Sequence, residues 1–185
     1  MDDSEVSLGD DMTLDYVIRV DDVPPTGRDA AFELPEEMRD AMTQRFGVRN
    51  LDVLKVDARL VTLDKECLHV TGTVKGRIEQ ICGITLEPIW TDISQSFSAE
   101  FQPESMVAKF VIPDDDFETD VPETLQDGAA NIGELAMQVF AMEIPTYPRQ
   151  EGVAFNAGAA GAEAPVSPFS VLADFYKANP GNDDT

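Results

Sequence analysis

Three segments alternate apolar and polar side chains with a period of two, and this pattern constrains the fold more than any other feature of the chain. The segments are residues 54–60, 68–79 and 89–101. Successive side chains of a strand point to opposite faces, so this period predicts strands with one buried face and one solvated face. The connections between the segments are short enough for hairpins. The sequence therefore predicts an antiparallel meander.

Other stretches show the same alternation less clearly. Residues 12–20 and 106–112 alternate and are expected to extend the sheet, and residues 28–34 have a weaker version of the pattern. Gly72 and Gly76 fall on the predicted buried face. Glycine there indicates a bend, a bulge or the close approach of a helix. A bend would curl the sheet toward a partial barrel.

Two helices are predicted in the same part of the chain. The first covers residues 35–46, with Pro35 at the first helical position and Gly47 as its stop. The second begins at Asn131 as the N-cap, with Glu134 placed as in a capping box, and ends at Pro145. We interpret both apolar stripes as core-facing, with a helix-in-groove binding site as the alternative. The predicted fold class is α+β, a mainly antiparallel curled sheet packed with two or three helices.

The C-terminal part differs in composition from the rest. Residues 156–165 are rich in Ala and Gly and are expected to form a flexible linker. Residues 167–177 predict a short amphipathic helix, which is too short to be stable alone and must dock on its own domain or on a partner. Its candidate docking residues are Phe169, Leu172 and Tyr176.

These patterns divide the chain into four parts. They are an acidic N-terminal tail at 1–10, an antiparallel-sheet domain at 11–150, a flexible linker at 151–166, and a short C-terminal helix with its tail at 167–185.

The charge of the chain is strongly negative, with 13 Lys and Arg against 36 Asp and Glu and a formal net charge of −23. Such a chain repels nucleic acid in general and suits a basic protein partner. Residues 45–77 are the one locally positive stretch, which is either a solvated strand face or a local RNA contact. Its cations on adjoining strands are Lys55, Arg59, Lys75 and Arg77, and Trp90 nearby either packs on the surface or stacks a base.

Catalytic and metal-binding patterns are not expected. The single histidine, His69, falls on a polar strand face, and no glycine-rich phosphate loop occurs. Cys67 and Cys82 lie at opposite ends of a predicted strand, about 50 Å apart, too far for a disulfide. We therefore predict no enzyme activity, no cofactor and no metal.

The sequence also bears on the compartment. No run of about 20 apolar residues suits a membrane helix. The N-terminus is acidic where a secretory signal would be basic and then apolar. The expected location is cytoplasmic, and neither DNA nor a membrane is an expected partner.

A family resemblance adds a more specific expectation. Residues 82–88, Cys-Gly-Ile-Thr-Leu-Glu-Pro, resemble the C-x-x-[CT]-L-E-P motif of the YceD family, the large ribosomal RNA subunit accumulation proteins. Many relatives carry a second cysteine where this chain has Thr85, so a dithiol and a metal role are not expected here. Further similar elements follow in the family's order over most of the chain, at Val20–Pro25, Arg45–Gly47, Asn131–Leu135 (I-D-L-G-E-L), Pro145–Arg149 (P-x-Y-P-R) and Ser167–Leu172 (N-P-F-A-V-L).

The resemblance implies a non-catalytic ribosome-biogenesis factor that promotes the synthesis, processing or stability of large-subunit 23S ribosomal RNA. Our leading hypothesis is contact with pre-ribosomal large-subunit RNA through the four cations named above. The alternative is an acidic module that holds a basic ribosomal protein during large-subunit assembly, and a nuclease is the poorest reading. The residues themselves favour a structural turn formed by Cys82, Thr85, Leu86, Glu87 and Pro88, with Glu87 accepting turn amides or recognising a partner.

Overall fold

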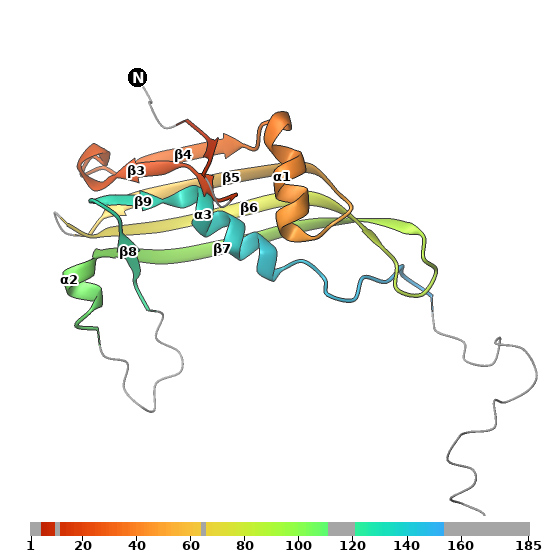
Figure 1. Ribbon diagram of the computed structural model, residues 1–185. Helices are drawn as coiled ribbons and strands as arrows, with labels where there is room; N and C mark the ends of the chain where they lie inside the picture. Colours follow the sequence, from red (N-terminus) through yellow and green to blue (C-terminus); the bar gives the residue numbers. More distant parts are fainter. Residues whose placement is uncertain (1–4, 10–11, 64–65, 111–120, 154–185) are drawn as a thin grey trace, which may run out of the picture. The chain divides into compact units, whose positions relative to one another are not determined.

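The computed structural model describes residues 5–9, 12–63, 66–110 and 121–153. Its main sheet has the strand order β4-β5-β6-β7-β8 (Figure 1). Strands β4 to β7 pair antiparallel in sequence order, and β8 pairs parallel with the end of β7. The α+β fold with a mostly antiparallel sheet is confirmed. The strands are β4 (Arg28–Glu33), β5 (Asn50–Thr62), β6 (Leu68–Ile81), β7 (Pro88–Pro103) and β8 (Glu123–Leu125).

The period of two correctly predicted the three long strands and their buried face. On β5 the alternate side chains Leu54, Val56, Ala58 and Leu60 are all buried, and Lys55, Asp57 and Arg59 between them are exposed. A register shift between Leu51 and Val53 marks a bulge in β5. We call the buried side the concave face and the opposite side the convex face.

Residues 12–20 do not extend the main sheet, contrary to the prediction. They form β2 (Leu14–Asp15), which pairs with β1 (Ser7–Leu8), and β3 (Val17–Arg19), which pairs with β9 (Ala129–Asn131). A 3₁₀ helix, Val20–Asp22, follows β3. The alternation itself is real, because Leu14, Tyr16 and Ile18 are buried. Periodicity identifies the buried face of a strand but not the strand with which it pairs.

Residues 106–112 were also predicted as a strand, and this is wrong over the part that the structure describes. Glu104–Val107 forms the short helix α2 directly after Pro103, the last residue of β7. Residues 111 and 112 lie outside the described residues. The chain thus turns away from the sheet where β7 ends, and β8 supplies the next strand.

Both predicted helices are present with small differences at their ends. In α1 (Glu36–Phe46), Pro35 is the N-cap instead of the first helical residue, and Gly47 ends the helix at a φ of 64°. In α3 (Ile132–Met142), the side chain of Asn131 accepts a hydrogen bond from the Glu134 amide (3.1 Å), as predicted for the N-cap. The helix ends at Met142, before Pro145.

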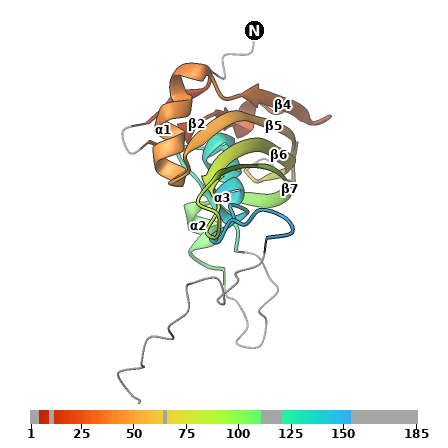
Figure 2. The ribbon, with the colours of Figure 1, turned by 90° about the vertical axis from the view of Figure 1, so that its right-hand side faces the viewer.

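Helix α3 lies against the concave face, and the sheet curls around it (Figure 2). A Cβ atom on Gly76 would lie 2.6 Å from Cε2 of Phe140 on α3 and 2.9 Å from the carbonyl oxygen of Val53. Of the three explanations offered for the glycines, close approach of a helix is therefore confirmed at Gly76. At Gly72 the space is filled by Phe97 of β7.

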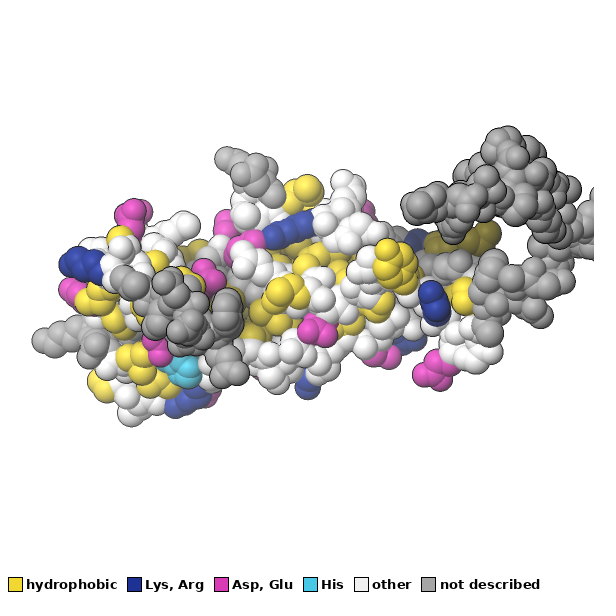
Figure 3. Space-filling view, turned by 90° about the horizontal axis from the view of Figure 1, so that it is seen from below, with side chains coloured by type: hydrophobic (Ala, Val, Ile, Leu, Met, Phe, Trp, Pro, Cys, Tyr) yellow, Lys and Arg dark blue, Asp and Glu magenta, His cyan; other side chains and the backbone are white. Residues whose placement is uncertain are grey.

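In Figure 1, β7 is the lowest of the long strands. Figure 3 shows the molecule from below, and apolar side chains run along the middle of this side. Within the described ranges, no helix is both long and apolar enough to cross a membrane.

Candidate binding surfaces

The four cations predicted to bind RNA all lie on the convex face. Lys55 and Arg59 are on β5, and Lys75 and Arg77 are on β6. Lys55 and Lys75 face each other directly across the two strands. The sheet register thus brings together residues that are about 20 positions apart in the chain, as the predicted meander requires.

Three of these cations pair with carboxylates. Lys55 Nζ lies 2.9 Å from Glu33 Oε2, Arg59 Nη1 lies 2.7 Å from Asp29 Oδ1, and Arg77 Nε lies 3.8 Å from Asp92 Oδ1. Their side chains stay about half exposed, at 56%, 48% and 47%. The arginines are therefore paired at the surface and not drawn into the core.

Carboxylates outnumber cations on the convex face. Strands β4 to β7 carry six there, beside the four cations: Asp29, Glu33, Asp57, Glu79, Asp92 and Glu100. Among the described residues, Lys75 has no ion-pair partner. The predicted cationic surface is thus a face of mixed charge, which offers a phosphate group few unpaired cations.

Trp90 lies on β7 beside this face. The guanidinium carbon of Arg77 is 5.3 Å from the centroid of the indole ring, a cation–π distance. One side of the ring is therefore already engaged by Arg77, which favours the packing interpretation of Trp90 over base stacking.

The Cys82–Pro88 motif forms the turn between β6 and β7. The Cys82 amide donates to the Glu87 carbonyl (2.9 Å), and Leu86, at a φ of 60°, donates its amide to the Cys82 carbonyl (3.0 Å). The hydroxyl of Thr85 accepts from the Glu87 amide (3.3 Å). For Glu87 the sequence predicts either acceptance of turn amides or recognition of a partner; in the structure the side chains of Thr85 and Cys82 accept turn amides.

The Cys82 thiol is buried in this turn and accepts several hydrogen bonds. The amides of Thr85 and Gln150 donate to Sγ at 3.5 and 3.4 Å. These bonds stabilise the thiolate: the Thr85 side chain foremost, then the amides of Thr85, Gln150 and Ile84, lower the pKa of Cys82 to about 6. The Gly83 amide also donates to the Pro148 carbonyl (2.9 Å), so the segment after α3 is fastened to the turn.

Cys82 and its described neighbours do not form a metal site. Neither Cys82 nor Cys67, at the other end of β6, takes part in a disulfide among the described residues. No cluster of three His, Cys, Asp or Glu side chains suited to a metal ion occurs within residues 5–9, 12–63, 66–110 and 121–153.

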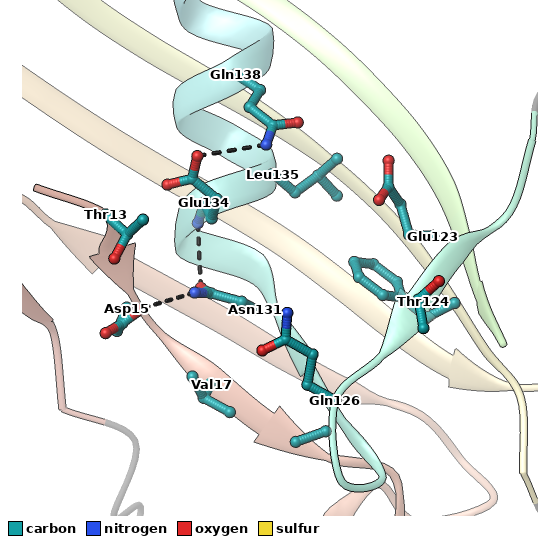
Figure 4. A pocket seen from close by; sticks show the side chains of 12 residues that line it. Thr13, Asp15, Val17, Glu123, Thr124, Gln126, Asn131, Glu134, Leu135 and Gln138 are labelled. Atoms are coloured by element: carbon teal, nitrogen blue, oxygen red, sulfur yellow. Dashed lines mark hydrogen bonds between the residues drawn. The ribbon is translucent and has the colours of Figure 1, made fainter. Parts of the chain in front are cut away.

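A polar hollow of about 450 Å³ lies beside the N-terminus of α3, and sequence reasoning did not predict it (Figure 4). Asp15, Asn131 and Glu134 lie on one side of it, and Glu123 and Thr124 of β8 on the other. Its lining comes from strands far apart in the sequence, and only the capping pattern at Asn131 and Glu134 could have indicated part of it.

The polar groups of this hollow largely bind one another. Asn131 accepts from the amides of Glu134 and Tyr16 and donates to Asp15 Oδ1 (2.7 Å). The Glu134 carboxylate accepts two bonds from Arg45 of α1 instead of returning to the helix cap. Burial alone would raise the pKa of Glu134, but the hydrogen bonds and charge of Arg45, together with bonds from Gln138 and the Leu14 backbone, hold that pKa below its usual value. This network joins α1, α3 and the N-terminal strands.

The predicted docking residues Phe169, Leu172 and Tyr176 lie outside the described residues, as does most of the predicted linker.

No family model matches the chain, and no curated protein or solved structure is significantly similar to it. The resemblance to the YceD family stays a prediction that rests on the motifs quoted above.

Proposed function

We propose that the protein is a non-catalytic ribosome-biogenesis factor that promotes accumulation of large-subunit 23S ribosomal RNA, and that it acts by holding a basic ribosomal protein during assembly. The order of motifs that resemble the YceD family supports the first part. The observation that carries the second part is the convex face, where carboxylates outnumber cations and three of the four cations are already paired.

Electrostatics favours a basic protein over RNA as the direct partner. A chain with a formal net charge of −23 attracts a cationic partner and repels phosphates. Direct RNA binding depends mostly on neutralising phosphates with cations. A basic protein gains from every unpaired carboxylate, whereas RNA must displace Glu33, Asp29 or Asp92 from the cation that it contacts. The proposal places the protein in the cytoplasm, where ribosomal subunits assemble.

Affinity purification with and without nuclease tests the mode of action. The tagged protein is purified from the cells that encode it, and half of the sample is treated with nuclease before washing. We expect a basic ribosomal protein to stay bound after treatment. Loss of all bound protein together with the RNA would contradict the protein-holding mode.

Depletion of the factor should lower the amount of large-subunit relative to small-subunit ribosomal RNA, and an unchanged ratio would contradict the first part of the proposal.

Direct contact with pre-ribosomal RNA is the second candidate, and one observation favours it. Lys55 and Lys75 lie side by side, and Lys75 has no ion-pair partner among the described residues. Exchanging Lys75 and Arg77 for Glu should then abolish retention of RNA at low salt. Unchanged retention by this double variant would remove the surface from consideration.

A further inference from the structure

The backbone hydrogen bonds of β7 show which of its peptide groups point away from the sheet. Cys82 and Glu87 continue the register in which Ile81 faces Pro88, and the Cys82 amide donates to the Glu87 carbonyl. In an antiparallel ladder, opposed pairs that bond to each other alternate with pairs that do not. Odd-numbered residues of β7 therefore bond to β6. The even-numbered residues turn their N–H and C=O groups to the outer edge: Trp90, Asp92, Ser94, Ser96, Ser98 and Glu100.

This outer edge is long and carries few of the features that usually protect an edge strand. Strand β8 pairs only with residues 101–103 of β7, and no other described strand pairs with that side. Residues 89–102 contain no proline, no lysine and no arginine, and the pairing with β6 continues without a bulge. Proteins commonly block exposed edges with lysine, proline or bulges. Among the described residues, no strand pairs with this edge of β7 before residue 101, so a further strand can be added there.

The opposite edge of the sheet is different. Strand β4 is six residues long and carries Arg28, Asp29 and Glu33, with both carboxylates in ion pairs to β5. The Leu34 amide bonds to the Leu54 carbonyl, which by the same alternation turns the peptide groups of Asp29, Ala31 and Glu33 outward. This short, charged edge provides a matched control for β7.

Apolar side chains gather on this side of the molecule (Figure 3), and two hollows lie beside β7. A hollow of about 560 Å³ surrounds Ser98–Glu100 and is lined by Leu135, Val139 and the largely exposed Met142 of α3. A second hollow, of about 670 Å³, lies at residues 89–92 beside Tyr147. From Asp92 to Ser98 an extended chain covers about 20 Å, so seven residues would bridge the two hollows.

The charges at this edge select the occupant. Asp92, Glu100, Glu123 and Glu151 line the two hollows, against the single cation Arg149. A second copy of the chain would bring its own net charge of −23 and be repelled. A basic segment would be attracted, and its apolar side chains would face α3 on the concave side.

We propose that the outer edge of β7 binds an extended segment of a basic protein by strand addition, with apolar residues of the segment toward α3 and basic residues toward Asp92 and Glu100. Main-chain hydrogen bonds to the even-numbered residues give affinity, and the hollows select alternating side chains. The basic character of this partner rests on the proposed function, whereas the open edge does not.

A defined peptide tests the proposal on the full-length protein. The probe is a fluorescein-labelled nine-residue peptide of alternating valine and lysine, measured by fluorescence anisotropy. One analogue carries N-methyl groups on three lysine amides, and the other carries them on three valine amides. A strand turns its lysine amides and its valine amides toward opposite edges. We expect one analogue to bind at least about tenfold more weakly and the other to bind like the parent peptide. Which analogue fails shows whether the added strand is antiparallel or parallel.

Protein variants locate the site. Ser96→Pro removes an outward amide of β7 and should weaken binding about tenfold, whereas Ala31→Pro, the same change at the β4 edge, should not. Met142→Ser at the hollow should weaken binding several-fold, and Leu86→Ser, an equally exposed apolar residue in the β6–β7 turn, should leave it unchanged. The peptide analogues keep the test decisive even if a proline variant fails to fold.

Absence of peptide binding, or equal binding by both methylated analogues, would overturn the proposal. So would tighter binding of a peptide copied from residues 167–177, or a dimer that Ser96→Pro dissociates, since each assigns the edge to another occupant. If the methylated peptides bind alike but a basic ribosomal protein is retained after nuclease treatment, strand addition fails and the proposed function stands. If instead one methylated peptide binds more weakly but no basic ribosomal protein is retained after nuclease treatment, strand addition stands and the proposed function fails.

Discussion

The two faces of the main sheet are built by neighbouring residues of the same strands and yet meet very different demands. On β6, Gly76 is covered by Phe140 of α3, while the adjacent Lys75 points to solvent on the convex face. The concave face is closely packed and admits no larger side chain at Gly76. The convex face holds ion pairs and serines that lie in solvent. One face therefore determines the fold, and the other can change its chemistry with little effect on it.

The largest expected effect concerns the contact between Phe140 and Gly76. Phe140→Ala should lower the free energy of unfolding by about 3–5 kcal/mol, because a fully buried ring is lost. Gly76→Ala should lower it by about 1–3 kcal/mol, because the new Cβ overlaps the ring. Urea denaturation measures both. The double variant should lose less free energy of unfolding than the sum of the two single losses, since the missing ring makes room for the methyl group. Strict additivity would contradict the contact.

Two ion pairs, one on each side of the sheet, allow a second comparison. Arg45→Met leaves the partly buried Glu134 without its partner and should cost about 1–3 kcal/mol at neutral pH. Lys55→Met breaks the exposed pair with Glu33 on the convex face and should cost less than about 1 kcal/mol. Denaturant titration of each variant gives these values, and equal losses would contradict the difference between the faces.

The Arg45 effect should also depend on pH in one direction. The folded pKa of Glu134 lies below its unfolded value, which is about 4.3. Its stabilising contribution is therefore complete above that value and is lost as the pH falls through the folded pKa. The stability difference between the natural protein and Arg45→Met should shrink on acidification, and a difference that grows would show the opposite sign of coupling.

The β6–β7 turn should reveal its hydrogen bonds through Cys82. In a Cys67→Ala background, absorbance of the thiolate near 240 nm should report a midpoint at about pH 6 for Cys82. Thr85→Val should move that midpoint upward, because it removes the main hydrogen bond that lowers the pKa. Since the folded pKa lies below the unfolded one, this contribution is full above about pH 8.5 and vanishes below pH 6. A midpoint unchanged by Thr85→Val would assign the shift to other groups.

The smallest effect is expected on the convex face. Lys75→Ala removes a lysine that faces Lys55 directly and should change the free energy of unfolding by no more than about 0.5 kcal/mol, in the stabilising direction if at all. The difference between the stability losses of Lys75→Ala and Gly76→Ala, at adjacent positions, measures how much more readily the convex face accepts a substitution than the concave face. A loss as large as that of Gly76→Ala would show that the faces are not distinct.

The sequence was sufficient to predict the parts of the fold that depend on local pattern. Alternation identified the long strands and their buried faces, and capping residues identified both helices. Pairing partners were not predictable in the same way. Residues 12–20 alternate like a strand of the main sheet, but β2 within them pairs with β1, and β3 pairs with β9, more than 100 residues later. Alternation determines which side of a strand is apolar and leaves its neighbour undetermined.

The binding surfaces show the same limit. Lys55, Arg59, Lys75 and Arg77 were correctly expected on one solvated face. Their neutralisation depends on strand register, because Asp29 reaches Arg59 from β4 and Asp92 reaches Arg77 from β7. The open edge of β7 likewise depends on how little of it β8 covers, which no pattern within β7 could indicate.

The position of α3 in the chain has a consequence for synthesis on the ribosome. Residues 28–103, which form four strands of the main sheet, are translated before Phe140 and the rest of α3. Until then α3 cannot cover the apolar side of those strands, and Asn131 is not yet present to bind Asp15 and Tyr16. Strand β3 (Val17–Arg19) can therefore pair with β9 only after most of the chain has been made. A nascent chain of this protein should therefore bind chaperones and remain susceptible to proteases until late in translation.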